Sequence, residues 1–332
     1  MEISSLISHA RDLSTRPRSN RFIPWNSISQ ILTQRAHQTP HKVFLIYYDR
    51  DGNRSELTYL EFFKKVQQRV ALLRKIGINP GEKVATYSGN FPETVLTYFS
   101  CWCYGVTVVP LNVGEDDQHL RFIISNSHAR IIFTRPELQD QIRQLLSSGS
   151  ETIDVPFIVE PIEVSDDESQ EVSRRWENIV NITGPDTEAL IVYTSGTTGN
   201  PKGVRLDHYN LLVDAWALAQ WHKITSQSRM MCVLPIHHVN GTVVTILTPL
   251  VAGSSFVLNE KFSVQTFFPR LANEEVEVVS VVPTLLAFLL EANASTDKLN
   301  LKLRHIICGA GPLTVELATR FEERYRIPIA HG

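Results

Sequence analysis

A stretch of twelve residues combines the residue types that bind phosphate groups. It runs from 193 to 204 and reads Tyr-Thr-Ser-Gly-Thr-Thr-Gly-Asn-Pro-Lys-Gly-Val. Its two central glycines lack a Cβ, so an anion can come close to their backbone amides, while the hydroxyls and the lysine add donors and a positive charge. We therefore predict a polyphosphate site made by Thr194, Ser195, Gly196, Thr197, Thr198, Gly199 and Lys202.

The order of residues in this stretch separates it from other glycine-rich segments. A Walker loop needs Gly-x-x-x-x-Gly-Lys followed by Ser or Thr, whereas Lys202 comes three residues after Gly199 and precedes Gly203. An apolar run precedes the stretch and a helical pattern starts at Asp207, so we expect a strand, a phosphate loop and then a helix. A flexible linker has similar small residues, but it has no need of the tyrosine before them or the Pro-Lys-Gly after them.

Three further loops are expected beside the phosphate loop. Right-handed crossovers place ligands at the carboxyl ends of parallel strands, so the residues that follow each strand should converge. The distinctive loops are Pro-Ile-His-His-Val-Asn-Gly at 235–241, Pro-Thr at 283–284 and Gly-Ala-Gly-Pro-Leu at 309–313.

The elements that must position these loops alternate between helix and strand along most of the chain. This alternation predicts an α/β fold of stacked βα units, with two mainly parallel, helix-flanked subdomains. We expect a tail at 1–24, a first α/β subdomain at 25–160, an acidic connector at 161–185, solvated over 161–172, and a second α/β subdomain at 186–332.

Local signals mark several element boundaries. Thr58 and Glu61 form a capping-box pattern at the start of a helix that should end near Gly77, and Asp51-Gly52 predicts a hairpin turn. We expect strands at 43–48 and 55–58 on either side of this turn. The other expected strands are 83–87, 106–111, 130–134, 155–159, 189–193, 230–234, 254–258, 276–282 and 304–308.

Composition narrows the class of protein. The chain has 332 residues, 43% hydrophobic content and a formal charge of −3, which suits a globular protein and does not favour nucleic-acid binding. Its four cysteines lie in apolar runs, so buried thiols are a better interpretation than metal ligands, and a cytoplasmic location is the simplest expectation. We find neither a secretory signal nor a run of the roughly 20 apolar residues that a transmembrane helix needs.

Together, the motifs resemble the adenylate-forming (AMP-binding) acyl-CoA synthetase superfamily, which also includes luciferases and the adenylation domains of peptide synthetases. The resemblance covers roughly residues 25–332. It rests on the phosphate loop, Leu-Pro-x-x-His at 234–238, Val-Pro-Thr at 282–284 and the small residues before Pro312-Leu313. It implies that a carboxylic acid and ATP give an acyl-adenylate and pyrophosphate, and that CoA then forms a thioester.

The resemblance also implies roles for individual residues. The segment 194–202 would hold the β- and γ-phosphates of ATP, and Gly309, Ala310 and Gly311 would line the adenine slot. His238 would be the gate between ATP and the acyl group, and Lys202 and His238 would act in catalysis. His237 and His238 each have a purely structural interpretation as well. The acyl pocket would include His238, Val239 and Gly241.

Val239 separates substrate classes. In the peptide-synthetase branch the residue after the gate is an aspartate that pairs with an α-ammonium group, and valine cannot do this. An amino-acid substrate is therefore disfavoured, and a lipophilic organic or fatty acid is expected. The stripe of Val239, Val243, Val244 and Leu247 fits an acyl tail, although ordinary core packing explains it equally well.

The sequence ends where relatives continue with Tyr-Gly-x-Thr-Glu. The resemblance implies that this glutamate binds Mg²⁺, and that a later aspartate and a C-terminal lysine complete the site. We therefore expect an N-terminal fragment with little activity alone and a possible separate C-terminal half. The alternatives are a catalytically inactive nucleotide-binding module, and another adenylating enzyme of the luciferase or peptide-synthetase kind.

Overall fold

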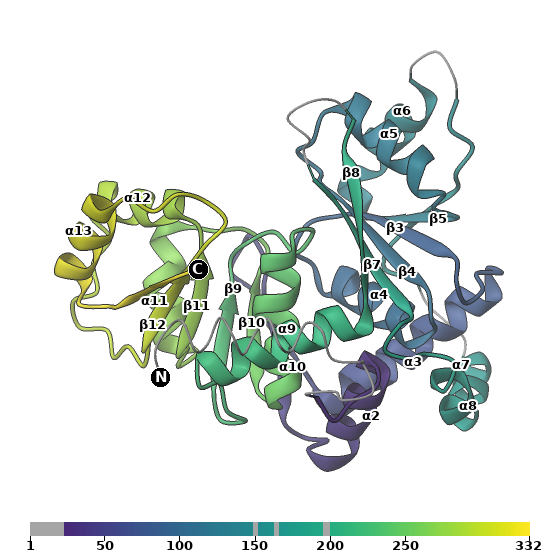
Figure 1. Cartoon of the computed structure of the whole chain (residues 1–332), viewed down its shortest axis with the longest axis horizontal. Coiled ribbons are helices and arrows are strands. Elements are labelled where there is room, and N and C mark those ends of the chain that lie inside the picture. The colour runs from purple at the N-terminus through teal and green to yellow at the C-terminus, as the bar shows by residue number, and fades with distance from the viewer. Residues whose placement is uncertain (1–22, 149–151, 163–165, 195–199) are drawn as a thin grey trace, which may run out of the picture.

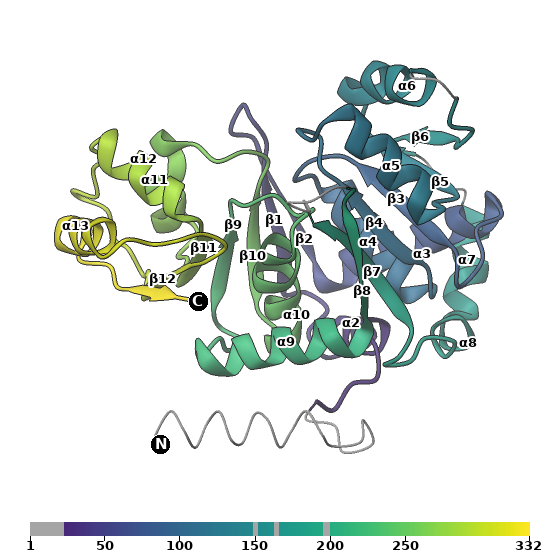
Figure 2. The same cartoon turned by 45° about the horizontal axis from the view of Figure 1, so that its top comes forward.

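The chain forms two β-sheets with helices between and outside them. The computed structural model describes residues 23–148, 152–162, 166–194 and 200–332. Figures 1 and 2 show the six-stranded sheet and the seven-stranded sheet side by side, with the C-terminal elements at the far edge of the seven-stranded sheet. The predicted fold class, a mixed α/β fold with two mainly parallel sheets, is confirmed.

The six-stranded sheet has the order β6-β5-β3-β4-β7-β8, and only β7 and β8 pair antiparallel. Its strands are β3 (Lys83–Tyr87), β4 (Thr107–Leu111), β5 (Ile131–Thr134), β6 (Phe157–Val159), β7 (Glu188–Thr194) and β8 (Lys202–Asp207).

The seven-stranded sheet has the order β13-β12-β11-β9-β10-β1-β2, and only β1 and β2 pair antiparallel. Its strands are β1 (Val43–Tyr48), β2 (Arg54–Thr58), β9 (Arg229–Cys232), β10 (Ser255–Asn259), β11 (Val278–Val281), β12 (His305–Cys308) and β13 (Ile329–His331).

The helices are mostly short and amphipathic. They are α2 (Ile28–Gln38), α3 (Tyr59–Lys75), α4 (Pro92–Cys103), α5 (Asp117–Ser127), α6 (Gln139–Ser147), α7 (Asp166–Arg174), α8 (Trp176–Val180), α9 (His208–Trp221), α10 (Thr248–Ala252), α11 (Val264–Asn273), α12 (Pro283–Glu291) and α13 (Val315–Tyr325), with a 3₁₀ turn η1 (Pro136–Leu138) and a π-helix η2 (Asn240–Leu247).

Three apolar cores hold the layers together. The largest lies between the sheets, where α3 and α4 contribute Phe62, Phe99 and Trp102 and β1 and β10 contribute Phe44 and Phe256. A second packs α11, α12 and α13 on the outer face of the seven-stranded sheet, and a third packs α5 and α6 on the outer face of the six-stranded sheet. The order of layers is therefore helix, sheet, helix, sheet, helix.

Both sheets take strands from both halves of the chain. β1 and β2 lie within the expected first subdomain but pair with β10, with Leu45 opposite Phe256. Conversely, β7 and β8 lie beyond the expected connector but complete the six-stranded sheet. The subdomain boundaries at 160 and 186 stay a prediction. In both sheets, strands from one side of these boundaries pair with strands from the other side.

Several local predictions are confirmed, and one is wrong. The capping box at Thr58 and Glu61 and the β1–β2 hairpin are present. The phosphate loop does not lead directly into a helix, because β8 follows it and α9 begins only at His208. The segment expected as a connector contains α7 and α8, and Trp176 of α8 is buried against Phe63.

Candidate functional site

The predicted phosphate loop connects the two antiparallel strands β7 and β8. Thr194 is the last residue of β7 and Lys202 the first of β8, the two are paired in register, and both side chains are exposed. Five of the predicted residues lie outside the described residues: Ser195, Gly196, Thr197, Thr198 and Gly199. The described strands bring Thr194 and Lys202 to the same end of one hairpin.

Gly203 explains part of the motif that follows Lys202. A Cβ at this position would lie 3.1 Å from both Ile191 Cγ2 and Tyr193 Cζ. The Tyr193 ring crosses the strand here, and its hydroxyl donates to Asn126 Oδ1 at 2.7 Å. The tyrosine and glycine of the motif therefore fix the hairpin on the sheet, which leaves Lys202 free to project.

The loop after β9 is held by a buried asparagine that the sequence analysis missed. Asn90 Nδ2 donates to the carbonyl oxygens of Leu234 and Asn259 at 2.9 and 3.0 Å, and Asn90 Oδ1 accepts from the Ile236 N–H at 2.9 Å. Asn90 follows β3, so it ties the carboxyl end of one sheet to the other. Asn90 could have been found from the sequence, because it comes just after the strand predicted at 83–87.

The two adjacent histidines of this loop differ in their surroundings. Their ring centroids lie 4.2 Å apart. Burial, with a smaller contribution from His238, lowers the pKa of His237 to about 4, and burial also lowers the pKa of His238. His237 Nε2 is buried and has no hydrogen-bond partner among the described residues. Both rings are therefore neutral at pH 7 and can accept a proton or a hydrogen bond.

A close backbone approach sets the geometry after the histidines. A Cβ at Gly241 would lie 2.3 Å from the Pro235 carbonyl oxygen and 2.8 Å from Ile236 Cα. The turn is closed by hydrogen bonds from His238 N–H to the Pro235 carbonyl and from Thr242 N–H to the His238 carbonyl, at 3.2 and 3.0 Å. Gly241 therefore lets η2 begin tightly against the loop, a role distinct from lining a pocket.

The predicted adenine turn lies beside η2. Asn240 Oδ1 accepts from Ser280 Oγ at 2.7 Å, which joins η2 to β11, and Gly309 N–H donates to the Val281 carbonyl at 3.2 Å. A Cβ at Gly309 would lie 2.8 Å from the Gly332 carbonyl oxygen, and Ala310 has a φ of 59°. Small residues are therefore needed here because other backbone comes close.

One cavity brings part of the predicted site together. It has a volume of about 570 Å³ and is lined by residues of α9, η2, β12, β13 and the adenine turn: Asp214, Ala217, Leu218, Trp221, His222, Asn240, Val244, Ile307, Gly309, Ala310, Ala330, His331 and Gly332. Gly309 and Ala310 thus share a cavity with Asn240 and Val244. Gly311, His238, Val239, Gly241 and Lys202 do not line it.

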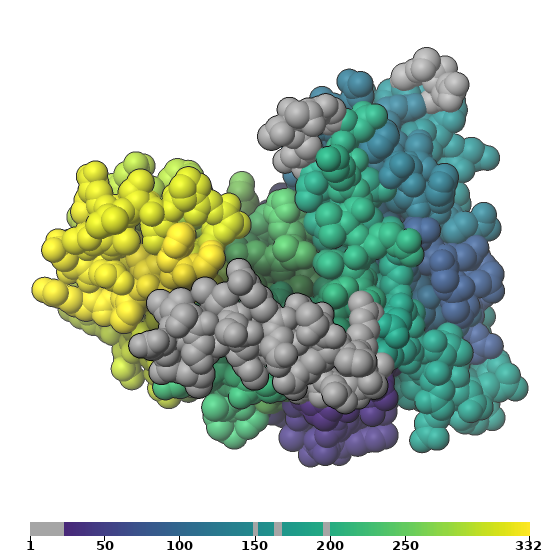
Figure 3. Space-filling view, in the orientation of Figure 1, coloured from purple at the N-terminus to yellow at the C-terminus, as the bar shows by residue number. Residues whose placement is uncertain are grey.

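A second cavity confirms that the carboxyl ends of the strands converge. It measures about 380 Å³ and contains His237 together with Asn90, Asn112, Glu260 and Val282, which follow β3, β4, β10 and β11. Figure 3 shows the surface hollowed between the yellow C-terminal part and the teal β7–β8 hairpin. Both sheets therefore direct their loops toward the region between them.

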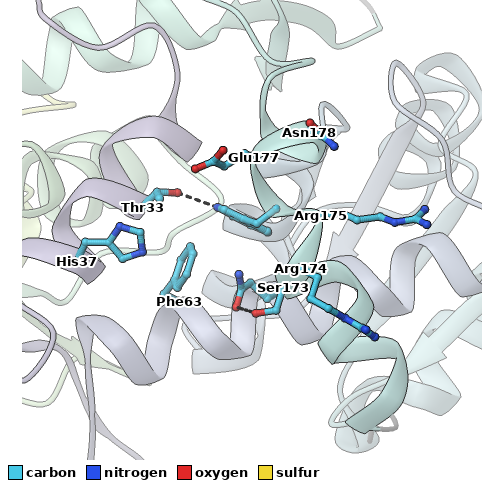
Figure 4. Close-up of a pocket in the computed structure, with 10 residues that line it drawn as sticks. Thr33, His37, Phe63, Ser173, Arg174, Arg175, Glu177 and Asn178 are labelled. Carbon is cyan, nitrogen blue, oxygen red and sulfur yellow. Dashed lines mark hydrogen bonds between the residues drawn. The ribbon is translucent and has the colours of Figure 1, made fainter.

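Two other cavities, of about 370 and 430 Å³, surround Trp176 between α2, α3 and the α7–α8 segment. Trp176 Nε1 donates to Thr33 Oγ1 at 2.8 Å, and Ser173 Oγ donates to Gln67 Oε1 at 2.9 Å (Figure 4). None of the residues of the four motifs lines these cavities. We therefore place the candidate site at the converging loops.

The described residues do not form a metal site. Within the described ranges, no group of three or more His, Cys, Asp and Glu side chains could hold a metal ion. In the same ranges, no helix has the length and hydropathy needed to cross a membrane.

Comparison with known proteins decides the family. The model of the AMP-binding enzyme family matches residues 32–332. The chain belongs to this family. The match covers all four motifs from which the resemblance was drawn, and it includes the strands of both sheets.

Several curated relatives of the chain are CoA ligases. The chain is 29% identical to sulfoacetate–CoA ligase of Cupriavidus necator, over 92% of the chain and 58% of that protein. It is 30% identical to 2-succinylbenzoate–CoA ligase of Bacillus velezensis, over 86% of the chain and 54% of that protein. The chain therefore spans about half the length of the curated relatives that it matches.

A solved structure supports the same assignment. The o-succinylbenzoate CoA synthetase of Bacillus subtilis, bound to a product analogue, superposes with a TM-score of 0.74 at 26% identity, over 91% of this chain and 58% of that chain. The named relatives are CoA ligases, and this chain shares their family and their fold over about half of their length.

Proposed function

We propose that the protein is an AMP-forming carboxylate–CoA ligase, or the nucleotide-binding part of one, that acts on a lipophilic organic or fatty acid. In this reaction a carboxylate oxygen attacks the α-phosphorus of ATP and pyrophosphate leaves. The thiol of CoA then attacks the acyl carbon and AMP leaves. The observation that carries the proposal is the cavity that joins the adenine turn at Gly309 and Ala310 to the apolar side chains of η2 and β12.

Each group of residues has a task in this proposal. Lys202 and the loop that begins at Thr194 bind the phosphates, because a carboxylate and ATP repel each other until the negative charge is neutralised. Gly309, Ala310 and Gly311 accept the adenine ring against backbone. His238, neutral at pH 7, separates the nucleotide from the acyl group and orients the carboxylate. ATP, Mg²⁺ and CoA remain the expected cofactor set.

The location of the protein belongs to the same proposal. All four cysteines are free and buried. Thiols that remain unpaired suit a reducing compartment, so we keep the expectation of a cytoplasmic protein.

The test uses a stable mimic of the acyl-adenylate, so it does not depend on turnover by this chain. Calorimetry would compare octanoyl-sulfamoyladenosine with sulfamoyladenosine that carries no acyl group. We expect the acyl compound to bind at least about tenfold more tightly, because its tail buries apolar surface. Equal affinities for the two compounds, in a chain that is folded by circular dichroism, would refute the proposal.

A lysine variant tests the nucleotide end of the site. Lys202→Ala should weaken binding of ATP with Mg²⁺ about tenfold, since a hydrogen bond to a charged group contributes about 1.5–3 kcal/mol. The matched control is Lys64→Ala, which removes the same charge from an exposed position on α3. Equal weakening by both variants would leave no specific role for Lys202.

A further inference from the structure

One face of α9 forms a wall of the 570 Å³ cavity. Asp214, Ala217, Leu218 and Trp221 all line it, and their spacing of three, four and seven residues places them on a single helical stripe. Figures 1 and 2 both show α9 running beneath the two sheets, with its C-terminal end toward β9. The stripe spans about 10 Å along the helix axis.

Asp214 gives this wall a negative charge. Its side chain is exposed at the surface of the cavity and has no hydrogen-bond or ion-pair partner among the residues that the structure describes, and partial burial raises the pKa of its carboxyl group. A carboxylate that has lost part of its hydration and has no partner gains most from a cation. Among the residues that the structure describes, no lysine or arginine lines the cavity.

Trp221 gives the same wall an aromatic surface. Its side chain is the last of α9, it is 75% exposed, and it takes part in no ring pair or cation–π contact among the described residues. The face of an indole ring attracts cations, most strongly those that water solvates weakly. Ala217 lies between Trp221 and Asp214 and has only a methyl group, so it leaves room between the two.

The rest of the lining suits a cation covered by methyl groups. Leu218, Val244 and Ile307 are apolar. His222 also lines the cavity, but burial lowers its pKa to about 4, and its Nδ1 lies 2.9 Å from His305 Nε2. The imidazole is therefore uncharged at neutral pH and does not compete for Asp214.

We propose that this cavity selects an acid whose tail carries a quaternary ammonium group, with Asp214 as the counter-ion and Trp221 as the aromatic wall. The inference rests on the proposed function, because it assigns the cavity to the tail of the acid. It also narrows that function, since a trimethylammonium tail has an apolar outer surface and a positive charge. Both residues determine specificity, and neither touches the reacting atoms.

Two matched ligands test the charge alone. Calorimetry would compare sulfamoyladenosine that carries a 4-(trimethylammonio)butanoyl group with the same compound that carries a 5,5-dimethylhexanoyl group. The two tails differ by nitrogen in place of carbon and by one positive charge. We expect the wild-type chain to bind the cationic compound about tenfold more tightly. Asp214→Asn should remove this preference, and Trp221→Leu should reduce it severalfold.

The outcomes separate this inference from the proposed function. If the neutral tail binds as tightly as the cationic tail or more tightly, and both exceed sulfamoyladenosine, the inference is overturned and the proposed function stands. If neither tail adds affinity, the proposed function itself fails. The control Glu323→Gln removes an exposed carboxylate on α13 and should leave the preference unchanged. A loss of preference in this control would show that net charge, and not Asp214, attracts the cation.

Discussion

Gly241→Ala should destabilise the protein even though alanine favours helices. The added Cβ would lie 2.3 Å from the Pro235 carbonyl oxygen and 2.8 Å from Ile236 Cα. An ordinary contact needs roughly 3.5 Å, so backbone must move by about 1 Å. Such overpacking costs about 1–3 kcal/mol, against a helix-propensity gain of up to about 1 kcal/mol. The net effect should be a loss of about 1–2 kcal/mol.

Thermal unfolding followed by circular dichroism measures this loss. For a chain of this size, about 1 kcal/mol lowers the Tm by roughly 2 °C, so we expect a decrease of about 2–4 °C. The control is Gly89→Ala, where a new Cβ would meet no atom within 4 Å and the Tm should stay the same or rise slightly. A Tm for Gly241→Ala equal to that of the wild type would refute the packing argument.

Two further predictions concern buried charge. Glu160→Gln should lower the free energy of unfolding by about 3 kcal/mol, because it leaves Arg69, which is 7% exposed, without its buried partner. Urea denaturation measures this loss. A double variant Arg69→Met/Glu160→Leu that is no more stable than Glu160→Gln would contradict the prediction. His208 is buried with a pKa of about 4, lowered by burial, so its unfolded form takes up a proton near pH 6.5 while its folded form stays neutral. Stability should therefore be full above pH 6.5 and fall by about 2 kcal/mol between pH 7 and pH 5. His208→Asn keeps an acceptor for the Ile28 N–H and should make the free energy of unfolding depend less on pH. If urea titrations of this variant show the same dependence on pH as the wild type, other groups cause it.

The sequence predicts the elements better than it predicts their pairing. The strand at 83–87 and the capping box at Thr58 have the expected bounds because their signals are local. β8 was missed because it is a mostly exposed edge strand in which only Val204 and Leu206 are apolar, too short an alternation to indicate a strand. The partners of β1 and β2 lie far along the chain, where no local pattern can indicate them.

In the candidate site, too, the sequence indicates local features but not the contacts between distant segments. The small residues at Gly309 and Ala310 mark a turn, and the structure adds that they share a cavity with α9. The sequence could not indicate Asp214 or Trp221, because a carboxylate and an indole seven residues apart on a helix are ordinary for a solvent-exposed face. Only the packing of α9 beside η2 and β12 turns this face toward a cavity.

The pairing of β1 with β10 has a consequence for synthesis on the ribosome. Leu45 and Phe256 are neighbours in the sheet but lie about 210 residues apart in the chain. At about 5–20 residues per second, β1 must wait roughly 10–40 seconds for its partner to be made. During this time the Val43–Tyr48 strand, four of whose six residues become buried, has an open edge. The nascent protein therefore presents a target for chaperones long before the seven-stranded sheet can close.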